Sequence, residues 1–572
     1  MYVSCRIVSS SKKVSSFFSI ARKLSGSKSL PENAICCPST DIIIPQVTLQ
    51  EIVYSKIEQF HKYIATEDVI TGKKYTFEQV RTKARNLSKA LRKRLNLQRG
   101  DVVAILLPNT PEYIISSLGI LEAGLVITSC NPIYTQKEIS SQLDDSEAKA
   151  IITIPALFSI ARAASLAIKQ HIPIICIKTK EGETLPLGGI CFEELVNTEI
   201  DMPDIEFGST NDLAFLPYSS GTTGLPKGVE LTHNNLVSMN AQAIHPDYQL
   251  FDTPSETFQD IIPGVLPMFH IYGFTILALN GLVNGSKLLT IPRFQPDLFI
   301  SMMKHHKVTV VYAAPPLALF MAQHEDIKSE YFSKLKFLMS GAAPLGSMDE
   351  ERLQNKLGKD VPILQGYGMT ESSGIVTICA SKILMKSMKD LRGSVGKPVP
   401  NTFIKVVGVD DTTGEQLGPN EPGEIWIKGP QIMRGYFKKP KETEAALKNG
   451  WLKSGDIGYY NEKKLLFITD RLKELIKVKG FQVAPAELEG ILREFPAVKE
   501  AAVVGVPHPV LGEAPKAYIV PKTNMSLDPE ELHRFVAERV AKYKQLTGGI
   551  EFVESIPKNP SGKILRRLLN KS

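Results

Sequence analysis

Short apolar runs alternate with amphipathic stretches along most of this chain. The runs are rich in β-branched residues, and three of them are DVVAILLP (101–108), AIITI (150–154) and IPIICIK (172–178). A long apolar stretch that carries Glu122 follows Pro111, and we expect it to form a buried helix rather than a membrane span. Pro111 with Glu112 is typical of the first turn of a helix. Continuous β-branched strands separated by helices predict layered α/β sheets whose strands are largely parallel.

Two later runs end in loops of small residues. VTVVYAAPP (308–316) and LKFLMSGAAPL (335–345) both finish in alanine and proline, the second with a glycine as well. Ligands of open parallel sheets bind outside the carboxyl ends of the strands, where such loops lie. We therefore expect a binding site at these loops.

The pattern of predicted strands and turns changes twice towards the C-terminus. After Arg392, short alternating strands with Gly/Pro turns predict a small β-subdomain, and a second break comes at ITDRLKELIKVKG (468–480). We expect an α/β fold: a large N-terminal domain of layered α/β sheets with a small β-subdomain, plus a small mobile C-terminal α+β domain. The predicted division is a tail at 1–35, the large domain at 36–469 and the small domain at 470–572.

Composition and charge narrow the class of protein. The 572 residues are 43% hydrophobic and 22% charged, which is ordinary for a soluble globular enzyme. Of the net charge of +7, six positive charges lie in residues 1–31, which contain no acid, so the rest lacks the basic field that nucleic-acid binding requires. Seven scattered cysteines without a CxxC pattern predict a reducing compartment and no zinc site. No apolar run reaches about 18 residues, so we expect no transmembrane segment, and we expect a monomer or weak dimer.

The basic N-terminal segment has the character of a targeting sequence. It is rich in serine and free of acid, and Val14, Phe17, Phe18 and Ala21 share one face of a helix. These features are typical of a mitochondrial transit peptide, although an unstructured tail has the same composition. The alternative is a cytoplasmic protein, or a peroxisomal one that lacks the C-terminal Ser-Lys-Leu address.

The run SSGTTGLPKG (219–228) has the composition of a phosphate-binding loop. Its glycines let the backbone approach an anion, its hydroxyl groups can donate hydrogen bonds, and Lys227 supplies a positive charge. A flexible surface turn is the alternative interpretation. The run is not a Walker A loop, because Gly228 rather than Ser or Thr follows the lysine.

Six further segments combine loop glycines with chemically useful side chains. They are PMFHIYG (267–273), SGAAPLG (340–346), QGYGMTESS (365–373), GWLKSGDIG (450–458), DRLKELIKVKGFQVAPAELE (470–489) and NPSGKILRR (559–567). With the glycine-rich loop they stand in the order found in adenylate-forming acyl-CoA synthetases, and from about residue 45 to 567 the chain resembles the branch that contains 4-coumarate–CoA ligases and firefly luciferase. The resemblance implies that a carboxylate attacks ATP-Mg²⁺ to give an acyl-adenylate and pyrophosphate, after which coenzyme A displaces AMP.

The resemblance also implies which residues hold the nucleotide. The glycine-rich loop would bind the departing pyrophosphate, a Thr-Glu pair would hold the phosphates and Mg²⁺, small residues and an aromatic ring would enclose adenine, and an Asp-Arg pair would bind the ribose. A carboxylate beside ATP is useful mainly as an oxygen ligand of Mg²⁺. The loop residues are Ser219, Ser220, Gly221, Thr222, Thr223 and Lys227, and the Thr-Glu pair is Thr370 and Glu371. The adenine enclosure is Gly341, Ala342, Ala343, Gln365, Gly366 and Tyr367, and the ribose pair is Asp456 and Arg471.

Catalysis and domain movement fall on another set of residues by the same resemblance. Lys563 matches the lysine that reaches the carboxylate and the α-phosphate, where a preorganised cation meets developing charge. His270 matches the histidine beside the acyl carboxylate, although a lone histidine among aromatic residues is more often part of a core. The remaining matches are Lys473 at the hinge, Lys477 and Gln482 beside the adenylate, and Arg293, Lys479 and Gly480 at coenzyme A.

The acid itself is the least determined part of the prediction. The expected pocket consists of Tyr272, Phe274, Gly341, Ala342, Gly374, Ile375 and Ile378. Plant coumarate ligases typically have Pro-Val where this chain has Gly374-Ile375, so a fatty acid and a hydroxycinnamate-like aryl acid both stay open. A luciferase-type monooxygenase that acts through the same adenylate is the alternative activity, and a carrier-loading adenylation domain is a third.

Overall fold

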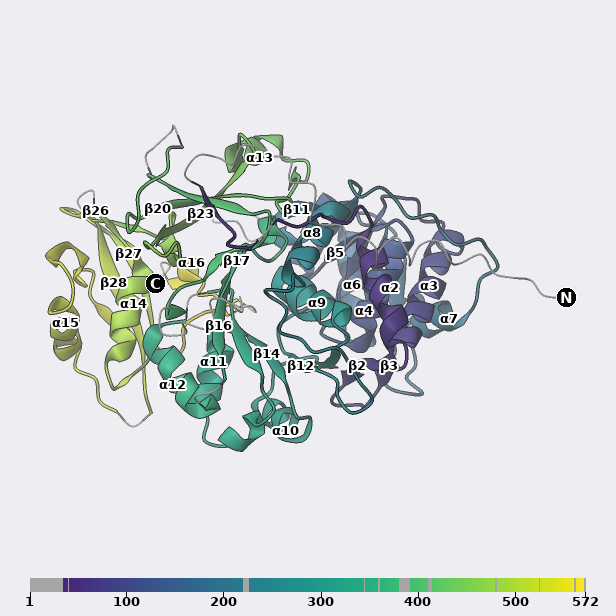
Figure 1. The fold of residues 1–572 in the computed structure, drawn as a ribbon, viewed down its shortest axis with the longest axis horizontal. Helices are drawn as coiled ribbons and strands as arrows, with labels where there is room; N and C mark the ends of the chain where they lie inside the picture. The colour runs from purple at the N-terminus through teal and green to yellow at the C-terminus, as the bar shows by residue number, and fades with distance from the viewer. Residues whose placement is uncertain are drawn as a thin grey trace.

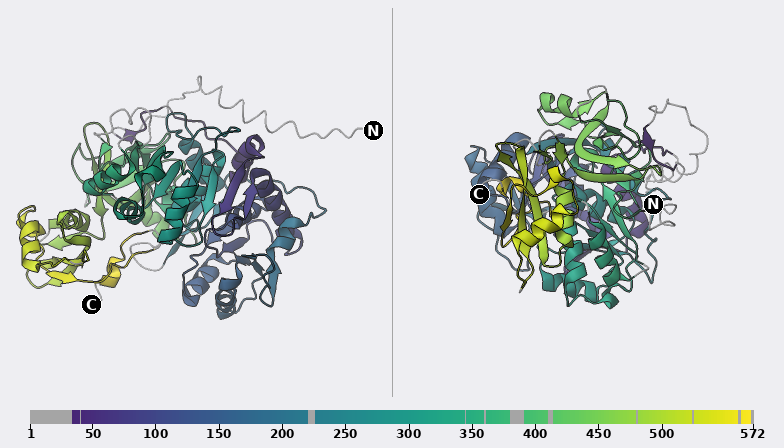
Figure 2. Two further views of the ribbon diagram at one scale, coloured as in Figure 1. Left: turned by 90° about the horizontal axis from the view of Figure 1, so that it is seen from below. Right: turned by 90° about the vertical axis from the view of Figure 1, so that its left-hand side faces the viewer.

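The structure is a computed structural model, and it describes residues 34–39, 41–219, 226–343, 345–358, 361–379, 391–409, 414–478, 481–523, 525–559 and 562–569. The apolar helical face at residues 14–21 and residues 1–33 of the predicted tail at 1–35 lie outside this set, whereas Ile35, the last residue of that tail, belongs to strand β1 (Ile35–Cys36). The ribbon is a large body built from several sheets, with a smaller lobe at one end that contains the last part of the chain (Figures 1 and 2).

A nine-stranded sheet holds most of the predicted strand–helix alternation. Its order is β10-β11-β9-β5-β4-β6-β7-β8, with β21 beside β11, and the run from β9 to β8 is parallel. Its strands are β4 (Val102–Ile105), β5 (Val126–Ser129), β6 (Ala150–Thr153), β7 (Ile174–Cys176), β8 (Gly189–Cys191), β9 (Leu213–Phe215), β10 (Tyr218–Ser219), β11 (Lys227–Thr232) and β21 (Gly435–Tyr436). The helices between the parallel strands are α4 (Pro111–Glu122), α5 (Gln136–Ser146), α6 (Pro155–Ala167) and α7 (Phe192–Asn197), and α3 (Phe77–Lys93) precedes β4.

The local signals explain these elements. Each residue of β4, β5 and β6 is buried, as expected for parallel strands covered on both faces. Helix α4 begins with Pro111 at its first position and is buried on all sides, which confirms the prediction of a buried helix rather than a membrane span. Capping boxes at Thr76 and Thr135 start α3 and α5.

Two further sheets complete the α/β part of the large body. The first has the order β12-β13-β2-β3 and the second β14-β15-β16-β17-β18; only β3, β17 and β18 run antiparallel to their neighbours. The strands are β2 (Ile64–Asp68), β3 (Lys74–Thr76), β12 (Ile261–Gly264), β13 (Lys287–Thr290), β14 (Val310–Ala313), β15 (Phe337–Ser340), β16 (Ile363–Tyr367), β17 (Thr377–Ile378) and β18 (Lys397–Pro398). The helices are α2 (Leu49–Phe60), α8 (His233–Ala243), the π-helix η1 (Tyr272–Leu279), α9 (Asn280–Val283), α10 (Pro296–His305), α11 (Pro315–Gln323) and α12 (Ser347–Leu357), with short 3-10 turns η2 (Ser329–Phe332) and η3 (Thr370–Ser372).

The predicted β-subdomain is a six-stranded antiparallel sheet. Its order is β1-β19-β20-β23-β22, and β24 pairs with β23. The elements are β1 (Ile35–Cys36), β19 (Phe403–Val407), β20 (Gly423–Lys428), β22 (Leu447–Lys448), β23 (Trp451–Tyr460) and β24 (Leu466–Arg471), with α13 (Pro440–Ala446) beside them. Ile35 pairs with Ile404 at one edge, and Arg471 pairs with Asp456 near the other.

The C-terminal lobe has its own sheet and its own core. The sheet order is β26-β25-β28-β27 with β29 beside β28, and Leu488, Leu492 and Ile519 are completely buried in its core. The elements are β25 (Ile476–Val478), β26 (Phe481–Val483), α14 (Pro485–Glu494), β27 (Val498–His508), β28 (Gly512–Pro521), α15 (Pro529–Ala537), the turn η5 (Lys542–Lys544), β29 (Ile550–Phe552) and α16 (Arg566–Leu569). The large N-terminal and small C-terminal parts of the predicted α/β fold are confirmed.

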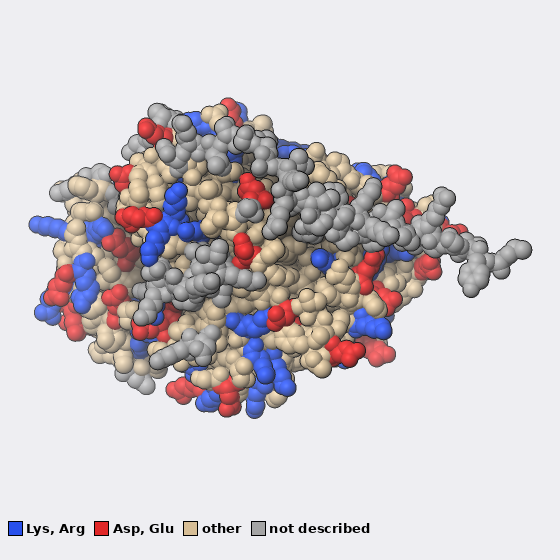
Figure 3. Space-filling model, viewed as in Figure 1, with Lys and Arg blue, Asp and Glu red and all other residues tan. Residues whose placement is uncertain are grey.

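The surface agrees with the charge pattern of the sequence. On the face in Figure 3, acidic and basic side chains are interspersed. Among the residues that the structure describes, no helix is long and apolar enough to cross a membrane. The six described cysteines are all free thiols.

Candidate active site

The carboxyl ends of β14, β15 and β16 bring the predicted adenine-binding residues together. Ser340 pairs with Ala313 on one side and with Gln365 on the other, so the loops after these strands are neighbours. The side-chain amide of Gln365 accepts a hydrogen bond from Leu345 N (3.2 Å) and donates one to Leu345 O (3.3 Å), which fixes the loop that contains Ala343. The sequence placed Gln365 in the adenine wall, and here its side chain supports that wall.

Glycine at position 341 allows a close ring contact. A Cβ atom there would lie only 3.1 Å from Cε1 of Tyr272, whose hydroxyl donates to Met339 O (3.1 Å). The next residue, Ala342, has a φ of +70°, a conformation uncommon for a residue with a side chain. Such strain is concentrated at functional sites. Gly341, Ala342 and Tyr272 therefore form one compact wall between the adenine loop and the expected acyl pocket.

The glycine-rich loop closes a hairpin whose two ends are described. Ser219 in β10 pairs with Lys227 in β11, whereas Ser220, Gly221, Thr222 and Thr223 lie outside the described residues. The Ser219 hydroxyl donates to Oε1 of Glu371 (3.0 Å), and Lys227 Nζ lies 5.0 Å from the centre of the Tyr436 ring. The base of the loop therefore contacts the predicted metal ligand directly.

Glu371 is a buried carboxylate at the start of the loop after β16. It is 6% exposed, next to Thr370 in η3, and its Oε1 also accepts a hydrogen bond from the hydroxyl of Tyr436 (3.0 Å). Two donors on one oxygen fix the orientation of the carboxylate. A single carboxylate beside Ser219, at the base of the predicted phosphate loop, suits Mg²⁺, which is usually held by one or two carboxylates together with substrate phosphates. The residues present therefore fit the ion.

The sequence analysis missed Tyr436. Burial raises the pKa of this tyrosine, so its hydroxyl keeps its proton and acts as a donor to Glu371. Its position depends on the pairing of β21 with β11, where Val229 lies opposite Tyr436. The pairing joins residues about 200 positions apart, and no local signal in RGYF indicates it.

Asp456 and Arg471 form the predicted ribose-binding pair. Asp456 is 4% exposed, accepts a hydrogen bond from the Tyr367 hydroxyl (2.7 Å) at Oδ2, and pairs with Nε of Arg471 (2.9 Å) at Oδ1. The Asp456 carboxylate raises the pKa of Arg471, so this guanidinium stays charged. The paired strands β23 and β24 hold the two residues opposite each other, and Tyr367 connects them to the adenine wall.

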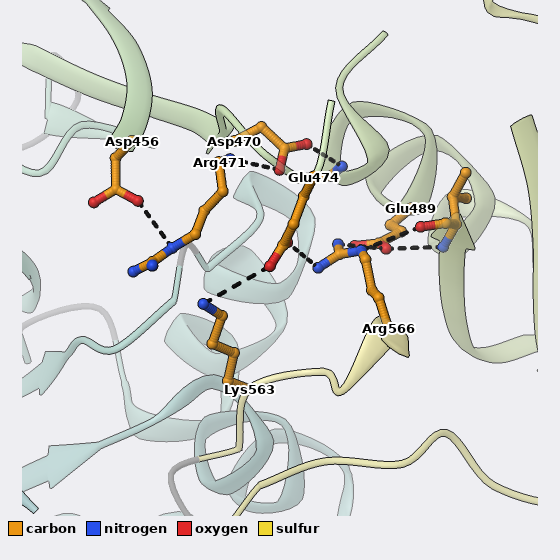
Figure 4. Close-up of polar contacts among 9 residues, drawn as sticks. Asp456, Asp470, Arg471, Glu474, Glu489, Lys563 and Arg566 are labelled. Atoms are coloured by element: carbon orange, nitrogen blue, oxygen red, sulfur yellow. Dashed lines mark hydrogen bonds and ion pairs between the residues drawn. The ribbon is translucent and has the colours of Figure 1, made fainter. Parts of the chain in front are cut away.

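Lys563 reaches this pair from the C-terminal lobe (Figure 4). Its ammonium lies 3.8 Å from Oε1 of Glu474, and burial together with the positive charge of Arg471 lowers its pKa. Gly562 has a φ of +83°, and a Cβ atom there would lie 2.8 Å from Pro316 Cγ at the end of β14. The tail therefore seats Lys563 at the strand ends that carry the nucleotide-binding loops.

An ionic network that the sequence analysis missed holds the tail in place. Arg566 donates to Glu474 and to Glu489 (2.7 Å), and its Nε donates to Val503 O (3.1 Å). Asp470 accepts from the backbone N–H groups of Arg471 (2.7 Å) and Ala486 (2.9 Å), which ties β24 to the start of α14. The only local signal was the three-residue spacing of Lys563 and Arg566.

The acyl-pocket residues divide between a cavity and the core. Ile375 and Ile378 line an apolar cavity together with Ile276, Met339 and Phe337. Phe274 is fully buried, and its ring packs 4.8 Å from Phe215 and 6.3 Å from Tyr113, so the structure places it in the core.

Gly374 has a φ of +116°, and a Cβ atom there would lie 2.5 Å from Thr275 Oγ1. The backbone at position 374 therefore packs directly on the π-helix. A proline cannot adopt this conformation, because its ring fixes φ near −65°.

His270 precedes the π-helix, and burial lowers its pKa to about 4. Its Nδ1 accepts a hydrogen bond from the Tyr272 N–H (3.4 Å). The imidazole is therefore neutral near pH 7 and can offer a substrate carboxylate a neutral hydrogen bond from its other nitrogen.

The remaining predicted residues lie on the surface or outside the described set. Three of them are exposed: Arg293, Lys473 and Lys477. The pKa of Lys473 is lowered, mainly by loss of contact with water and in smaller part by the positive charge of Lys227. Lys477 pairs with Gln482 across β25 and β26. Among the described residues, no hydrogen bond or ion pair joins Arg293 or the Lys477 side chain to the nucleotide site. Lys479, Gly480 and the Gln482 side chain lie outside the described residues.

This fold and site are those of an enzyme that activates a carboxylate with a nucleotide, and the second lobe places Lys563 beside Glu474 at the predicted nucleotide site. The family model for AMP-binding enzymes matches residues 54–437, and the model for the AMP-binding enzyme C-terminal domain matches residues 487–563. The chain belongs to the AMP-binding enzyme family.

Relatives and solved structures agree with this assignment. The chain is 37% identical to 4-coumarate–CoA ligase 1 of Solanum tuberosum over 92% of its own length and 94% of the relative's, and 38% identical to 4-coumarate–CoA ligase 1 of Arabidopsis thaliana over 92% and 93%. It is 26% identical to ATP-bound MatB from Rhodopseudomonas palustris (TM-score 0.81; 92% and 99% covered) and to a benzoate CoA ligase from Burkholderia xenovorans LB400 (TM-score 0.79; 92% and 100% covered).

The chain is therefore an ATP-dependent acid–thiol ligase. It forms an acyl-adenylate and then a coenzyme A thioester, and it releases pyrophosphate and AMP. The same relatives favour this activity over the luciferase-type alternative.

Proposed function

We propose that the acid has an apolar tail, either that of a fatty acid or that of a hydroxycinnamate-like aryl acid. The observation that supports this proposal is the apolar cavity lined by Ile276, Met339, Ile375 and Ile378. The cavity is small, and its walls would have to move apart to admit a tail. Apolar surface buried on binding contributes about 25 cal/mol per Å², so a tail packed against these side chains would gain affinity that a small polar acid cannot. The names of the coumarate and benzoate relatives support the aryl acid, whereas glycine at position 374 departs from the plant pattern and supports the fatty acid.

Adenylate formation needs a charged lysine and a neutral histidine at the reacting carboxylate. Lys563 offers a cation to the α-phosphate, and His270 offers a neutral N–H to the acid, so the attacking oxygen is oriented without being neutralised. Glu371 would hold Mg²⁺, and the ion would neutralise charge on the ATP phosphates. Ser219 and Tyr436 keep this carboxylate oriented towards the loop.

Thioester formation needs a different position of the C-terminal lobe. In this proposal the chain pivots at Lys473, Lys563 withdraws, and Lys479, Gly480 and Arg293 meet coenzyme A. Lys473 follows the last strand of the β-subdomain by two residues, which is a suitable place for a pivot.

The test is an acid panel with ATP, Mg²⁺ and coenzyme A. Fatty acids of increasing length, coumaric and caffeic acids, benzoate, malonate and acetate are compared by release of AMP and pyrophosphate. We expect one fatty or aryl class to exceed malonate and acetate by at least about tenfold in kcat/KM, since each buried methylene is worth about 0.8 kcal/mol. A preference for malonate or acetate would contradict the proposed acid class, and Lys563→Ala is the control without adenylation.

We also propose a mitochondrial location. The support is the basic, acid-free composition of residues 1–31. Imaging of the full chain and of a chain that lacks residues 1–33 tests it: loss of mitochondrial signal on truncation is expected, and an unchanged distribution would overturn it.

A further inference from the structure

One ion pair joins the C-terminal lobe to the nucleotide side of the large domain. Arg493 of α14 lies with its Nε 3.6 Å from Oδ2 of Asp349 in the first turn of α12. The Asp349 side chain is 8% exposed, whereas the Arg493 side chain is 26% exposed. The pair therefore has one buried partner, unlike the exposed surface pairs that contribute almost nothing.

The turn that carries Asp349 is attached to the adenine wall. Gly346, the last residue of the loop before α12, is the N-cap of that helix. A Cβ atom on Gly346 would lie 3.6 Å from Asp349 Oδ2 and 3.9 Å from Nη2 of Arg493, so all three residues are close together. The next acidic residue, Glu350, accepts a hydrogen bond from Gln365 (3.1 Å), which also holds the loop at Leu345. Arg493 thus contacts the helix turn on which the adenine wall is built.

The same position of the lobe presents Lys563 to the site. Gly562 packs on Pro316, and Lys563 lies beside Glu474 near the Asp456–Arg471 pair. Pro316 and the Lys563-bearing tail meet in the first turn of α11, which follows β14, and not at α12. The Arg493–Asp349 pair is therefore a second point of attachment for the arrangement that forms the adenylate.

We propose that Arg493 is a positioning residue for the first half-reaction: its ion pair with Asp349 docks the C-terminal lobe so that Lys563 reaches the α-phosphate. The inference rests on the proposed use of two lobe positions. A contact present in only one of two conformations favours that conformation by its own free energy, and it leaves the chemistry of the other unchanged. Loss of the pair should therefore slow adenylate formation and spare thioester formation.

The chain contains a matched control. Arg352 lies with its Nη1 3.5 Å from the other carboxylate oxygen of Asp349, and it belongs to the same helix, α12. Arg352→Met removes a positive charge from the same carboxylate without removing a contact between the domains. If the two arginines only stabilise Asp349, Arg352→Met and Arg493→Met should change the first half-reaction equally. If Arg493 docks the C-terminal lobe, only Arg493→Met should slow it.

The experiment compares the wild type with Arg493→Met, Arg493→Lys and Arg352→Met. Acid-dependent exchange of labelled pyrophosphate into ATP reports the first half-reaction, and conversion of purified acyl-adenylate with coenzyme A reports the second. For Arg493→Met we expect about a tenfold lower exchange rate, an unchanged second half-reaction within about twofold, and an unchanged melting temperature. Arg493→Lys should recover most of the exchange, and Arg352→Met should match the wild type.

Several outcomes would overturn the inference. These are equal loss in Arg493→Met and Arg352→Met, parallel loss of both half-reactions, or wild-type exchange in Arg493→Met. Small-angle scattering of the unliganded proteins gives a readout that needs no acid: Arg493→Met should be less compact than the wild type, and identical curves would contradict docking by this pair. If none of the fatty or aryl acids supports pyrophosphate exchange by the wild type, the proposed substrate class is refuted instead. The scattering comparison still decides the role of Arg493 in that case.

Discussion

Replacement of Gly374 by alanine is the most direct test of how the acyl-pocket wall is built. The residue has a φ of +116°, far outside the regions that residues with a side chain adopt. A Cβ atom would also lie 2.5 Å from Thr275 Oγ1, a hydroxyl already fixed by its hydrogen bond to Ile271 O (2.7 Å). The substitution therefore introduces backbone strain and steric overlap together.

The two costs can be estimated and separated. Unfavourable backbone geometry costs about 1–3 kcal/mol, and overpacking at a buried contact costs about 1–3 kcal/mol. We expect Gly374→Ala to lower the free energy of unfolding by about 2–6 kcal/mol, the sum of the two costs. We also expect it to reduce kcat/KM for the preferred acid, because the wall at Ile375 shifts. In the double variant with Thr275→Ala the overlap disappears and only the strain remains.

Denaturant unfolding of the four proteins in this cycle measures the coupling, and the acid panel measures selectivity. A coupling of about 1–3 kcal/mol between the two sites is expected. Gly374→Ala with wild-type stability and wild-type acid preference would refute the reasoning. Gly374→Pro, the residue of plant coumarate ligases, should be worse than alanine here because proline cannot reach this φ.

Three further predictions concern protons and the metal ligand. Burial and the positive charge of Arg471 lower the pKa of Lys563, so Lys563 should lose its charge at a pH below the usual lysine range. The rate of pyrophosphate exchange should therefore decline as the pH rises through that lowered pKa. Lys563→Arg should remove this alkaline decline even if its rate is lower, and a pH profile of both proteins measures the difference. Tyr436→Phe removes a donor to Glu371 and should raise the Mg²⁺ concentration for half-maximal exchange about tenfold with kcat little changed, and an unaltered Mg²⁺ dependence would argue against a metal at this carboxylate. Burial lowers the pKa of His233 from 6.5 to about 4, so as the pH falls the unfolded chain binds this proton before the folded protein does. The contribution of His233 to the free energy of unfolding is therefore constant above pH 6.5 and falls by about 3 kcal/mol towards pH 4. His233→Asn should flatten that part of a stability–pH curve.

The sequence predicted those parts of the fold and site that depend on local pattern. The strands β4, β6 and β7 were predictable because parallel strands covered on both faces have continuous apolar sequences. Helix α4 was predictable because Pro111 and Glu112 mark its first turn. The sequence assigned Asp456 and Arg471 to a common role, and the structure holds them opposite each other on paired strands.

The missed features depend on tertiary pairing or on core packing. Tyr436 reaches Glu371 only through the β11–β21 pair, and Glu474, Glu489 and Arg566 meet only after the lobe has folded. The resemblance assigned Phe274 to the acyl pocket, whereas the structure places it in a π-helix with its ring packed on Phe215 in the core. Periodicity alone contains neither kind of information.

The chain leaves the large domain along the strand that carries Arg471, the predicted ribose contact. Arg471 is the last residue of β24, it is held by Asp456, and Lys473 lies only two residues further on. Glu474, the next residue, lies beside Lys563. The predicted ribose contact, the proposed pivot and the carboxylate beside Lys563 therefore follow one another within four residues of the chain. In the proposed alternation, loss of the nucleotide from Arg471 and rotation of the lobe would be coupled through this short segment, so the position of the lobe would govern the order in which products leave.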